Sequence, residues 1–322
     1  MEAAIIIVFV FGYIAITIEH SLNIDKLVPA LIRMAFSWAL ISFGIDDFTT
    51  WFDPSKHALI NNFEAFGHDE KMHILEDTLL HHLGKTAEIL IFLIGAMTIV
   101  EIIAYFNGFS TIKNFIKTKK KTNLLWIFAI LAFILSAIID NLTATIVLIS
   151  LLQKIIQDQK MRIWFAGLIV VSANAGGAFS PIGDVTTTML WIANKVTTGH
   201  LIGYLLLPSI VCMLVPTFIA SRLPVFKGYL DIDTSTSERT GHFFSSFMLY
   251  LGLAAIVFVP IFKTATHLPP YVGMMLSLGI VAIFAEIYSF SKFSMTKLDK
   301  EDLDSHVHVS PVHQTLSKIE LP

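Results

Sequence analysis

The sequence contains little cysteine and little charge. Cys212 is its single cysteine, so no disulfide can form within the chain, and a small buried residue in an apolar segment is expected there. Charged residues make up 15% of the chain, against about 25% in soluble domains. Hydrophobic residues make up 55%, and the mean hydropathy is +0.71. This composition excludes an ordinary soluble domain and predicts a polytopic membrane protein.

Several signatures of enzymes and secreted proteins are also missing from the sequence. It has no nucleotide-binding loop, zinc signature or nucleophile elbow, so neither an enzyme nor a bound cofactor is predicted. The net charge of −3 is too small to indicate a nucleic-acid partner. The N-terminus lacks the basic region of a signal peptide, which predicts a retained first helix. The expected partners are the lipid bilayer and small ions, and a homo-oligomer remains open.

Long apolar runs are what the sequence does contain. A helix that crosses a bilayer needs about 20 apolar residues. Lysines gather in 107–122, which the positive-inside rule places in the cytoplasm, and the acidic loop 45–86 is then expected outside. The histidines of that outer loop match no metal-ligand spacing. Simple spans are predicted at 3–19, 25–44, 87–106, 201–220, 243–262 and 271–290.

The apolar segment 123–152 is interrupted by Asp140 and Asn141. Basic residues flank it on both sides, which places both flanks in the cytoplasm. A straight helix of about 30 residues would extend ~45 Å, well beyond a hydrocarbon core of about 30 Å. We therefore predict a re-entrant hairpin of two half-length helices that meet at Asp140. The alternative is one long tilted helix with an outer loop at 153–162.

A second polar interruption lies within the apolar segment 163–193. Gly176 with Gly177, and Pro181 with Gly183, disfavour a continuous helix there, so we predict a crossing helix that is unwound in its middle. Irregular backbone at membrane depth is tolerated only where it lies within protein or lines a water-filled cavity. Broken helices of this kind indicate the binding site of a transporter.

Two similar proline-containing segments, Leu27–Met34 and Leu268–Met275, open spans that the topology orients in opposite directions. This is the pattern of inverted repeats in secondary transporters. No second pair of polar interruptions follows, so the second repeat is expected to be truncated. We predict a first repeat, a cytoplasmic linker, the first two spans of a second repeat, and a cytoplasmic tail, at 1–222, 223–242, 243–290 and 291–322.

The interrupted segments resemble a known family. Residues 90–101 (LIFLIGAMTIVE), 136–143 (SAIIDNLT) and 172–191 (SANAGGAFSPIGDVTTTMLW) are similar to NhaD-type sodium/proton antiporters, as is 263–270. That family belongs to the ion transporter superfamily, which also holds arsenite pumps and dicarboxylate transporters. The resemblance implies an all-α, inverted-repeat secondary transporter. It would exchange Na⁺ or Li⁺ for H⁺ across a bacterial cytoplasmic membrane, for sodium extrusion and pH homeostasis. It also implies that family members continue beyond this C-terminus.

The polar residues of the two interruptions form the predicted ion-binding site. Carboxylate, amide and hydroxyl oxygens suit a hard cation, and broken helices add free carbonyl oxygens. Burial penalises a charged carboxylate, so a proton and a cation can compete for the same oxygens, which is sufficient for antiport. In the alternative, each aspartate only caps a helix. The predicted site residues are Asp140, Asn141, Asp184, Thr186, Thr187, Asn174 and Ser136.

Glu88 and Glu101, in the span 87–106, are candidates for a proton relay. An interfacial carboxylate and a lysine partner are their alternative roles. No metal site is predicted beyond the transported Na⁺. Two rival functions remain. One is the same fold with an anionic cargo, a carboxylate or arsenite, for which only Arg33 offers a buried cation. The other is an inactive or partial chain whose missing half another chain supplies.

Overall fold

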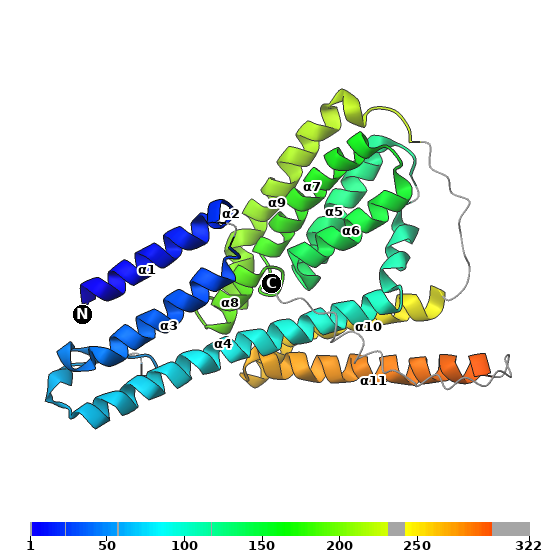
Figure 1. Cartoon of the computed structure of the whole chain (residues 1–322). Coiled ribbons are helices and arrows are strands. Elements are labelled where there is room, and N and C mark those ends of the chain that lie inside the picture. Colours follow the sequence, from blue (N-terminus) through cyan, green and yellow to red (C-terminus); the bar gives the residue numbers. More distant parts are fainter. Residues whose placement is uncertain (1, 23, 57, 117, 231–241, 298–322) are drawn as a thin grey trace. The chain divides into compact units, whose positions relative to one another are not determined.

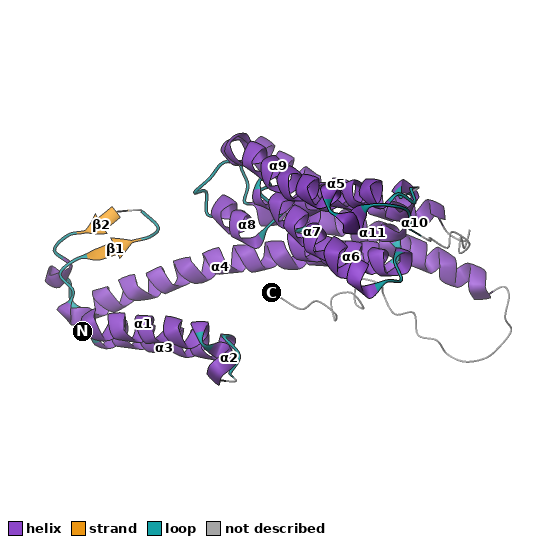
Figure 2. Ribbon diagram, turned by 90° about the horizontal axis from the view of Figure 1, so that it is seen from above, coloured by secondary structure: helices purple, strands orange, loops and turns teal. Residues whose placement is uncertain are grey.

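The computed structural model describes residues 2–22, 24–56, 58–116, 118–230 and 242–297 (Figure 1). Over these ranges the chain is helical, apart from its connecting loops and one two-stranded sheet, drawn in orange in Figure 2. The chain divides into two compact units, residues 1–87 and 88–322, which are described in turn.

The first unit opens with two apolar helices that pack against each other, α1 and α3. Arg33 of α3 lies close to two aromatic rings of α1, 4.9 Å from the Phe9 centroid and 4.3 Å from the Tyr13 centroid. Such cation–π contacts offset part of the cost of placing a guanidinium group among apolar residues. The elements, in chain order, are α1 (Glu2–Thr17), α2 (Glu19–Leu22), α3 (Leu27–Phe43), the 3₁₀ turn η1 (Ile45–Asp47), β1 (Trp51–Asp53), β2 (Ala58–Ile60), the 3₁₀ turn η2 (Phe63–Ala65) and the first part of α4 (His68–Tyr105).

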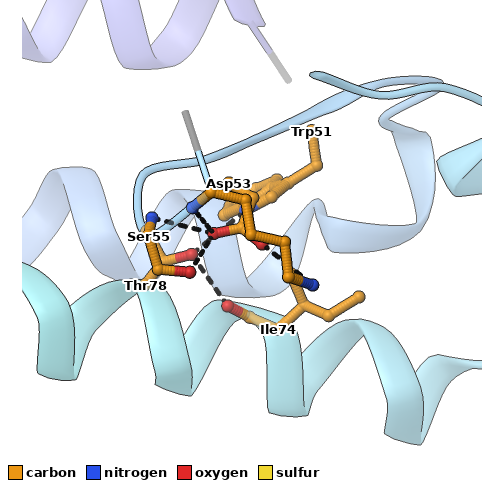
Figure 3. Close-up of polar contacts among 6 residues, drawn as sticks. Trp51, Asp53, Ser55, Ile74 and Thr78 are labelled. Carbon is orange, nitrogen blue, oxygen red and sulfur yellow. Dashed lines mark hydrogen bonds and ion pairs between the residues drawn. The ribbon is translucent and has the colours of Figure 1, made fainter. Parts of the chain in front are cut away.

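The sheet and the start of α4 share a small core of their own. β1 and β2 pair antiparallel, and Ile45, Phe63 and Leu75 are buried. The Trp51 indole N–H donates to the Thr78 hydroxyl at 3.1 Å, and that hydroxyl donates to the Ile74 carbonyl at 2.8 Å (Figure 3). The acidic segment that the composition predicts as a loop is therefore an ordered structure packed on a helix.

Asp53 closes the turn between the two strands. Its Oδ1 accepts hydrogen bonds from the Ser55 backbone N–H at 2.9 Å and from the Ser55 hydroxyl at 2.5 Å, and the Lys56 ammonium lies 3.5 Å from Oδ2 (Figure 3). These donors stabilise the charged form, and the Ser55 hydroxyl contributes most. Together they lower the pKa of Asp53 to about 2.

The single helix α4 replaces two elements that the sequence predicts separately, the second half of the loop 45–86 and the span 87–106. It runs without interruption for 38 residues and crosses the division between the two units. The segment before residue 87 is charged, but it contains no proline, and Met72, Leu75 and Leu79 recur at helical spacing. Charged residues indicate where a helix is expected to leave the bilayer, but the helix itself can continue beyond that point.

The second unit contains a group of helices that lie side by side, α5, α6, α7 and α9, and a pair that pack together, α10 and α11 (Figures 1 and 2). One core of buried apolar side chains joins α4, α5, α6 and α7 to α10 and α11. The elements after α4 are the 3₁₀ segment η3 (Gly108–Phe115), α5 (Lys121–Ile139), α6 (Asn141–Ile155), α7 (Gln159–Ala178), α8 (Val185–Ile192), α9 (Thr198–Arg222), the 3₁₀ turn η4 (Pro224–Phe226), α10 (His242–Thr266) and α11 (Pro270–Lys297).

Helix lengths support the predicted all-α membrane protein. Among the described residues, six helices are long and apolar enough to cross a membrane by length and composition, namely α4, α5, α7, α9, α10 and α11. The predicted spans 3–19 and 25–44 appear as α1 and α3, which have 16 and 17 residues. The expected buried position of Cys212 is wrong, because this residue is on an exposed face of α9.

Some predicted parts stay untested. Residues 231–241 of the predicted linker and residues 298–322 of the predicted tail lie outside the described residues. The division into inverted repeats, and the side of the membrane on which each loop lies, remain predictions.

Candidate functional site

The first interruption is a break between α5 and α6 at a single residue, Asp140. Its φ of 92° and ψ of 153° stop the helix, and a positive φ is uncommon and strained in any residue other than glycine. The carboxylate then caps the next helix, because its Oδ1 accepts the Thr143 backbone N–H at 2.8 Å. α6 packs back against α5 and α7. The single long helix considered as an alternative for 123–152 is therefore wrong, while re-entry from one side of the membrane stays a prediction.

The second interruption separates α7 from α8 and spans residues 179–184. Pro181 and Gly183 lie in it, as predicted. Gly176 and Gly177 do not, because both are inside α7, which continues to Ala178. The prediction that these two glycines break the helix is wrong. Asp184 ends the interruption and caps α8, with the Thr186 backbone N–H 3.2 Å from its Oδ2.

The glycines instead allow the two breaks to come close together. A Cβ atom on Gly176 would lie 2.7 Å from both the carbonyl carbon and the Cα of Phe133 in α5. A Cβ on Gly183 would lie 2.6 Å from the Ser136 carbonyl oxygen. Both distances are far below ordinary contact, so only glycine permits the backbone of α7 and the segment after it to approach α5 this closely.

Asn141 joins the two interruptions through hydrogen bonds. Its Nδ2 donates to Asp184 Oδ1 at 3.2 Å and to Asn174 Oδ1 at 2.9 Å. Asn141 follows Asp140 directly in the chain, so the two aspartates lie on either side of one amide. The structure thus brings together Asp140, Asn141, Asn174 and Asp184, which come from both predicted interruptions.

The predicted hydroxyl residues take different positions around this group. Thr186 is exposed, and its hydroxyl donates to Asp184 Oδ2. Thr187 is buried, and its hydroxyl lies 2.9 Å from the carbonyl oxygens of both Ser180 and Asp184. Ser136 is fully buried and donates to the Ala173 carbonyl at 2.6 Å, which links α5 to α7. Thr186 therefore contacts a site carboxylate, whereas Thr187 and Ser136 hold the backbone around it.

The charges in the site are all of one sign. Within the described residues, no lysine, arginine or histidine forms an ion pair with Asp140 or Asp184. The hydrogen-bond partners of both carboxylates are neutral backbone, amide and hydroxyl donors. Each carboxylate also sits at the N-terminal end of a helix, where the helix dipole favours negative charge. The arrangement therefore keeps two carboxylates without a fixed cation.

The predicted relay residues both lie on α4. Glu88 is one helical turn before Phe92, whose ring packs edge-on against Trp191 of α8, with the centroids 6.3 Å apart. Glu101 is partly buried farther along α4, and it has no ion pair in the part of the chain that the structure describes. The lysine partner considered for Glu101 is thus absent there, and a relay role for either residue stays a prediction.

The sequence reasoning did not identify Lys263, which lies near the C-terminal end of α10. Its Nζ donates to the Trp191 carbonyl of α8 at 2.8 Å and lies 4.3 Å from the centroid of the Trp191 ring. A lysine at the end of an apolar span was the available signal, since charged groups at such positions need a partner. The partner itself depends on how α8 and α10 pack.

Comparisons with known proteins point to one family. The citrate transporter family CitMHS matches residues 4–290. The chain is 35% identical to sodium/proton antiporter 1 of Arabidopsis thaliana over 299 residues, which are 92% of this chain and 48% of that protein. It is 33% identical to sodium/proton antiporter 2 of the same plant, over 88% of this chain and 62% of that protein. It is 29% identical to the Na⁺/H⁺ antiporter NhaD of Alkalimonas amylolytica, over 87% of this chain and 53% of that protein.

These matches confirm the resemblance to sodium/proton antiporters that the sequence motifs indicate. The chain spans about half the length of the curated relatives that it matches, from 48% to 62% in these three cases. No solved structure matches the chain significantly.

Proposed function

The chain belongs to the citrate transporter family CitMHS. We propose that, within this family, it exchanges Na⁺ or Li⁺ for H⁺ across a membrane. Relatives named as sodium/proton antiporters, in a plant and in bacteria, support this cargo. Because the chain spans about half of their length, their activity comes to this chain as a proposal.

The observation that carries the proposal is a pair of carboxylates at two adjacent helix breaks, bridged by Asn141 and, among the described residues, lacking a cationic partner. Asn141 contacts Asp184 at 3.2 Å and is the chain neighbour of Asp140. Intramembrane carboxylates are costly and are retained mainly for ion pathways. Broken helices near the bilayer midplane are where secondary transporters bind their ions.

The exchange follows from competition for the same oxygens. A hard cation prefers carboxylate, amide and carbonyl oxygens, which Asp140, Asp184 and Asn174 supply. In the structure, hydrogen bonds from Asn141 and Thr186 occupy the Asp184 oxygens. A cation that binds there would displace these donors, and a proton would remove the charge that attracts the cation. One site with two mutually exclusive occupants couples their movement when access alternates between the two sides.

An anionic cargo is the second candidate, because the matching family is described as a citrate transporter. The N-terminal ends of α6 and α8 both lie at the breaks, and helix N-termini favour anions. Here, however, the side chains of Asp140 and Asp184 already occupy those ends as caps. Arg33, the cation that an anion carrier would use, contacts Phe9 and Tyr13 within the first unit. The acidic caps at the two breaks, and the position of Arg33 in the first unit, favour a cationic cargo over an anionic one.

The test is transport by the purified chain in lipid vesicles with an imposed pH gradient, followed by a pH-sensitive dye. Asp140→Asn and Asp184→Asn are suitable variants, because asparagine caps a helix as well as aspartate does and only the charge is lost. Asp158→Asn is the matched control, since Asp158 caps α7 by accepting the Lys160 N–H at 3.1 Å, away from the two breaks.

We expect Na⁺ or Li⁺, and not citrate, to dissipate the gradient. Both site variants should lose this activity by about tenfold or more, the effect of removing a charged ligand, while Asp158→Asn retains it. Activity retained by both site variants would mean that the aspartates serve only as caps. Dissipation by citrate alone would establish the anion carrier instead.

We further propose a role in sodium extrusion and pH homeostasis at the cytoplasmic membrane of a bacterium. The protein would act without a cofactor and without covalent chemistry, driven by the ion gradient. Its partners would be the bilayer and small cations, with no nucleic acid. The bacterial relatives support this choice of membrane.

A further inference from the structure

The eight-residue helix α8 (Val185–Ile192) carries a candidate site residue at its start and a hub of contacts at its end. Asp184 caps its N-terminus, and Trp191 is 1% exposed near its C-terminus. A helix this short has no appreciable stability of its own. Its position must therefore come from its contacts with the rest of the protein, and its two ends are about 12 Å apart at 1.5 Å per residue.

Three elements hold the C-terminal end of α8 through Trp191. The indole N–H donates to the Thr198 hydroxyl of α9 at 2.9 Å. Phe92 of α4 packs edge-on against the ring. Lys263 of α10 makes two contacts with the same residue, a hydrogen bond of 2.8 Å to the backbone carbonyl and a cation–π contact of 4.3 Å to the ring centroid.

Lys263 suits this position because a charged donor complements both groups of Trp191 that it contacts. The last carbonyl groups of a helix lack intrahelical partners and carry partial negative charge, which an ammonium group stabilises. The face of an indole ring is also negative and attracts the same ammonium group. One lysine therefore fixes the end of α8 both along the helix axis and across it.

We propose that Lys263 is a positioning residue for the ion site, which holds α8 in register and thereby sets the position of Asp184. This inference rests on the proposed function for its consequence in transport, and on the contacts of Trp191 for its structural part. Through Lys263, Trp191 and α8, the C-terminal end of α10 is then connected to the second helix break. A movement of α10 would then reach the site through two turns of helix.

The structural part is tested by thiol labelling, because Cys212 is the sole cysteine of the chain. In a Cys212→Ser background, Thr188→Cys places a thiol on α8 at a position that is 2% exposed. We expect a small water-soluble thiol reagent to modify it slowly. Adding Lys263→Gln should accelerate labelling about tenfold, as the loss of one charge-assisted hydrogen bond implies, and Lys263→Arg should restore protection.

Two controls separate this effect from others. Lys195→Gln removes a nearby exposed charge just after α8, and it should leave labelling unchanged. Leu148→Cys, at a fully buried position of α6, should stay protected unless Lys263→Gln unfolds the protein. If the Lys263→Gln variant does unfold, the inference is judged on whether the Lys263→Arg variant protects the Thr188→Cys thiol. Any of three outcomes would overturn the inference. Lys263→Gln could leave the labelling rate of the Thr188→Cys thiol unchanged, Lys195→Gln could accelerate labelling equally, or Lys263→Arg could fail to protect the thiol.

The consequence for transport is read in the vesicle assay. Lys263→Gln should raise the Na⁺ concentration for half-maximal exchange about tenfold, with a maximal rate close to that of the wild type, and Lys263→Arg should reverse the change. An unchanged half-saturation in an actively transporting chain would overturn the positioning role. If the wild-type chain shows no Na⁺ exchange but the labelling pattern is as expected, the proposed function is refuted. The contact of Lys263 with Trp191 would still position α8.

Discussion

Substitution of Gly176 by alanine provides a sharp test of how the two helix breaks come together. A Cβ atom at this position would lie 2.7 Å from two backbone carbons of Phe133. Carbon atoms in ordinary contact are about 3.5–4.0 Å apart, so α5 and α7 must separate by roughly 1 Å. Backbone atoms cannot move aside as a flexible side chain can. Overpacking of this kind costs about 1–3 kcal/mol.

Gly167→Ala is the matched variant, on the same helix α7. A Cβ atom at Gly167 would meet nothing within 4 Å, so the substitution adds no collision. Alanine is more favourable than glycine in a helix interior by about 1 kcal/mol. The same gain applies to Gly176, which is also inside α7, so the two variants should differ in free energy of unfolding by the overpacking cost of about 1–3 kcal/mol, with Gly176→Ala the less stable.

The measurement is thermal unfolding of the purified protein in detergent. At about 2–4 °C per kcal/mol, the unfolding midpoint of Gly176→Ala should lie roughly 2–12 °C below that of Gly167→Ala. Gly176→Ala should also reduce Na⁺ exchange. Asp140 follows α5 and the segment that ends at Asp184 follows α7, so separating these two helices moves the two carboxylates apart. Equal midpoints for the two variants would refute the close approach of α5 and α7 at Phe133.

Two further predictions concern single side chains. Asn141→Ala removes the amide that donates to both Asn174 and Asp184. A bound cation has to displace the hydrogen bond to Asp184, and a hydrogen bond to a charged group contributes about 1.5–3 kcal/mol, so the Na⁺ concentration for half-maximal exchange should fall at least about tenfold. An unchanged value would show that cation binding does not displace this hydrogen bond. The pKa of Asp53 is about 2, below its ordinary value of 3.8, so its carboxylate stabilises the folded state above pH 3.8 and loses that effect as the pH falls through 2. Wild type should therefore exceed Asp53→Asn in unfolding midpoint at about pH 6, and the difference should shrink at about pH 2.5; a constant difference would contradict the assigned hydrogen bonds.

The break at Asp140 is the part of the site that sequence reasoning predicts best. A carboxylate and an amide within an apolar segment, flanked by basic residues, do not fit a single crossing helix, and the structure has a break at that residue. The positive φ of Asp140 was not predictable, because the preference of an isolated aspartate does not favour it. The surrounding packing imposes that conformation.

Gly176 and Gly177 show the opposite case. Their low helix propensity predicts a break, yet both are helical. Propensity is a small effect of about 1 kcal/mol per glycine, and the contact between α7 and α5 that only glycine permits outweighs it. The same argument applies to the acidic stretch before residue 87, where packing on Phe63 and Ile45 favours helix over loop.

The sequence by itself determined the class of the protein, because a mean hydropathy of +0.71 and long apolar runs allow only a membrane environment. It also determined which polar residues interrupt those runs, since hydrophobic patterning is local information. Tertiary structure alone decided that Asn141 reaches Asp184 across 43 positions of the chain, and that Lys263 holds Trp191 from another helix 72 positions away. Such contacts depend on how helix backbones pack, and no local pattern in the chain encodes them.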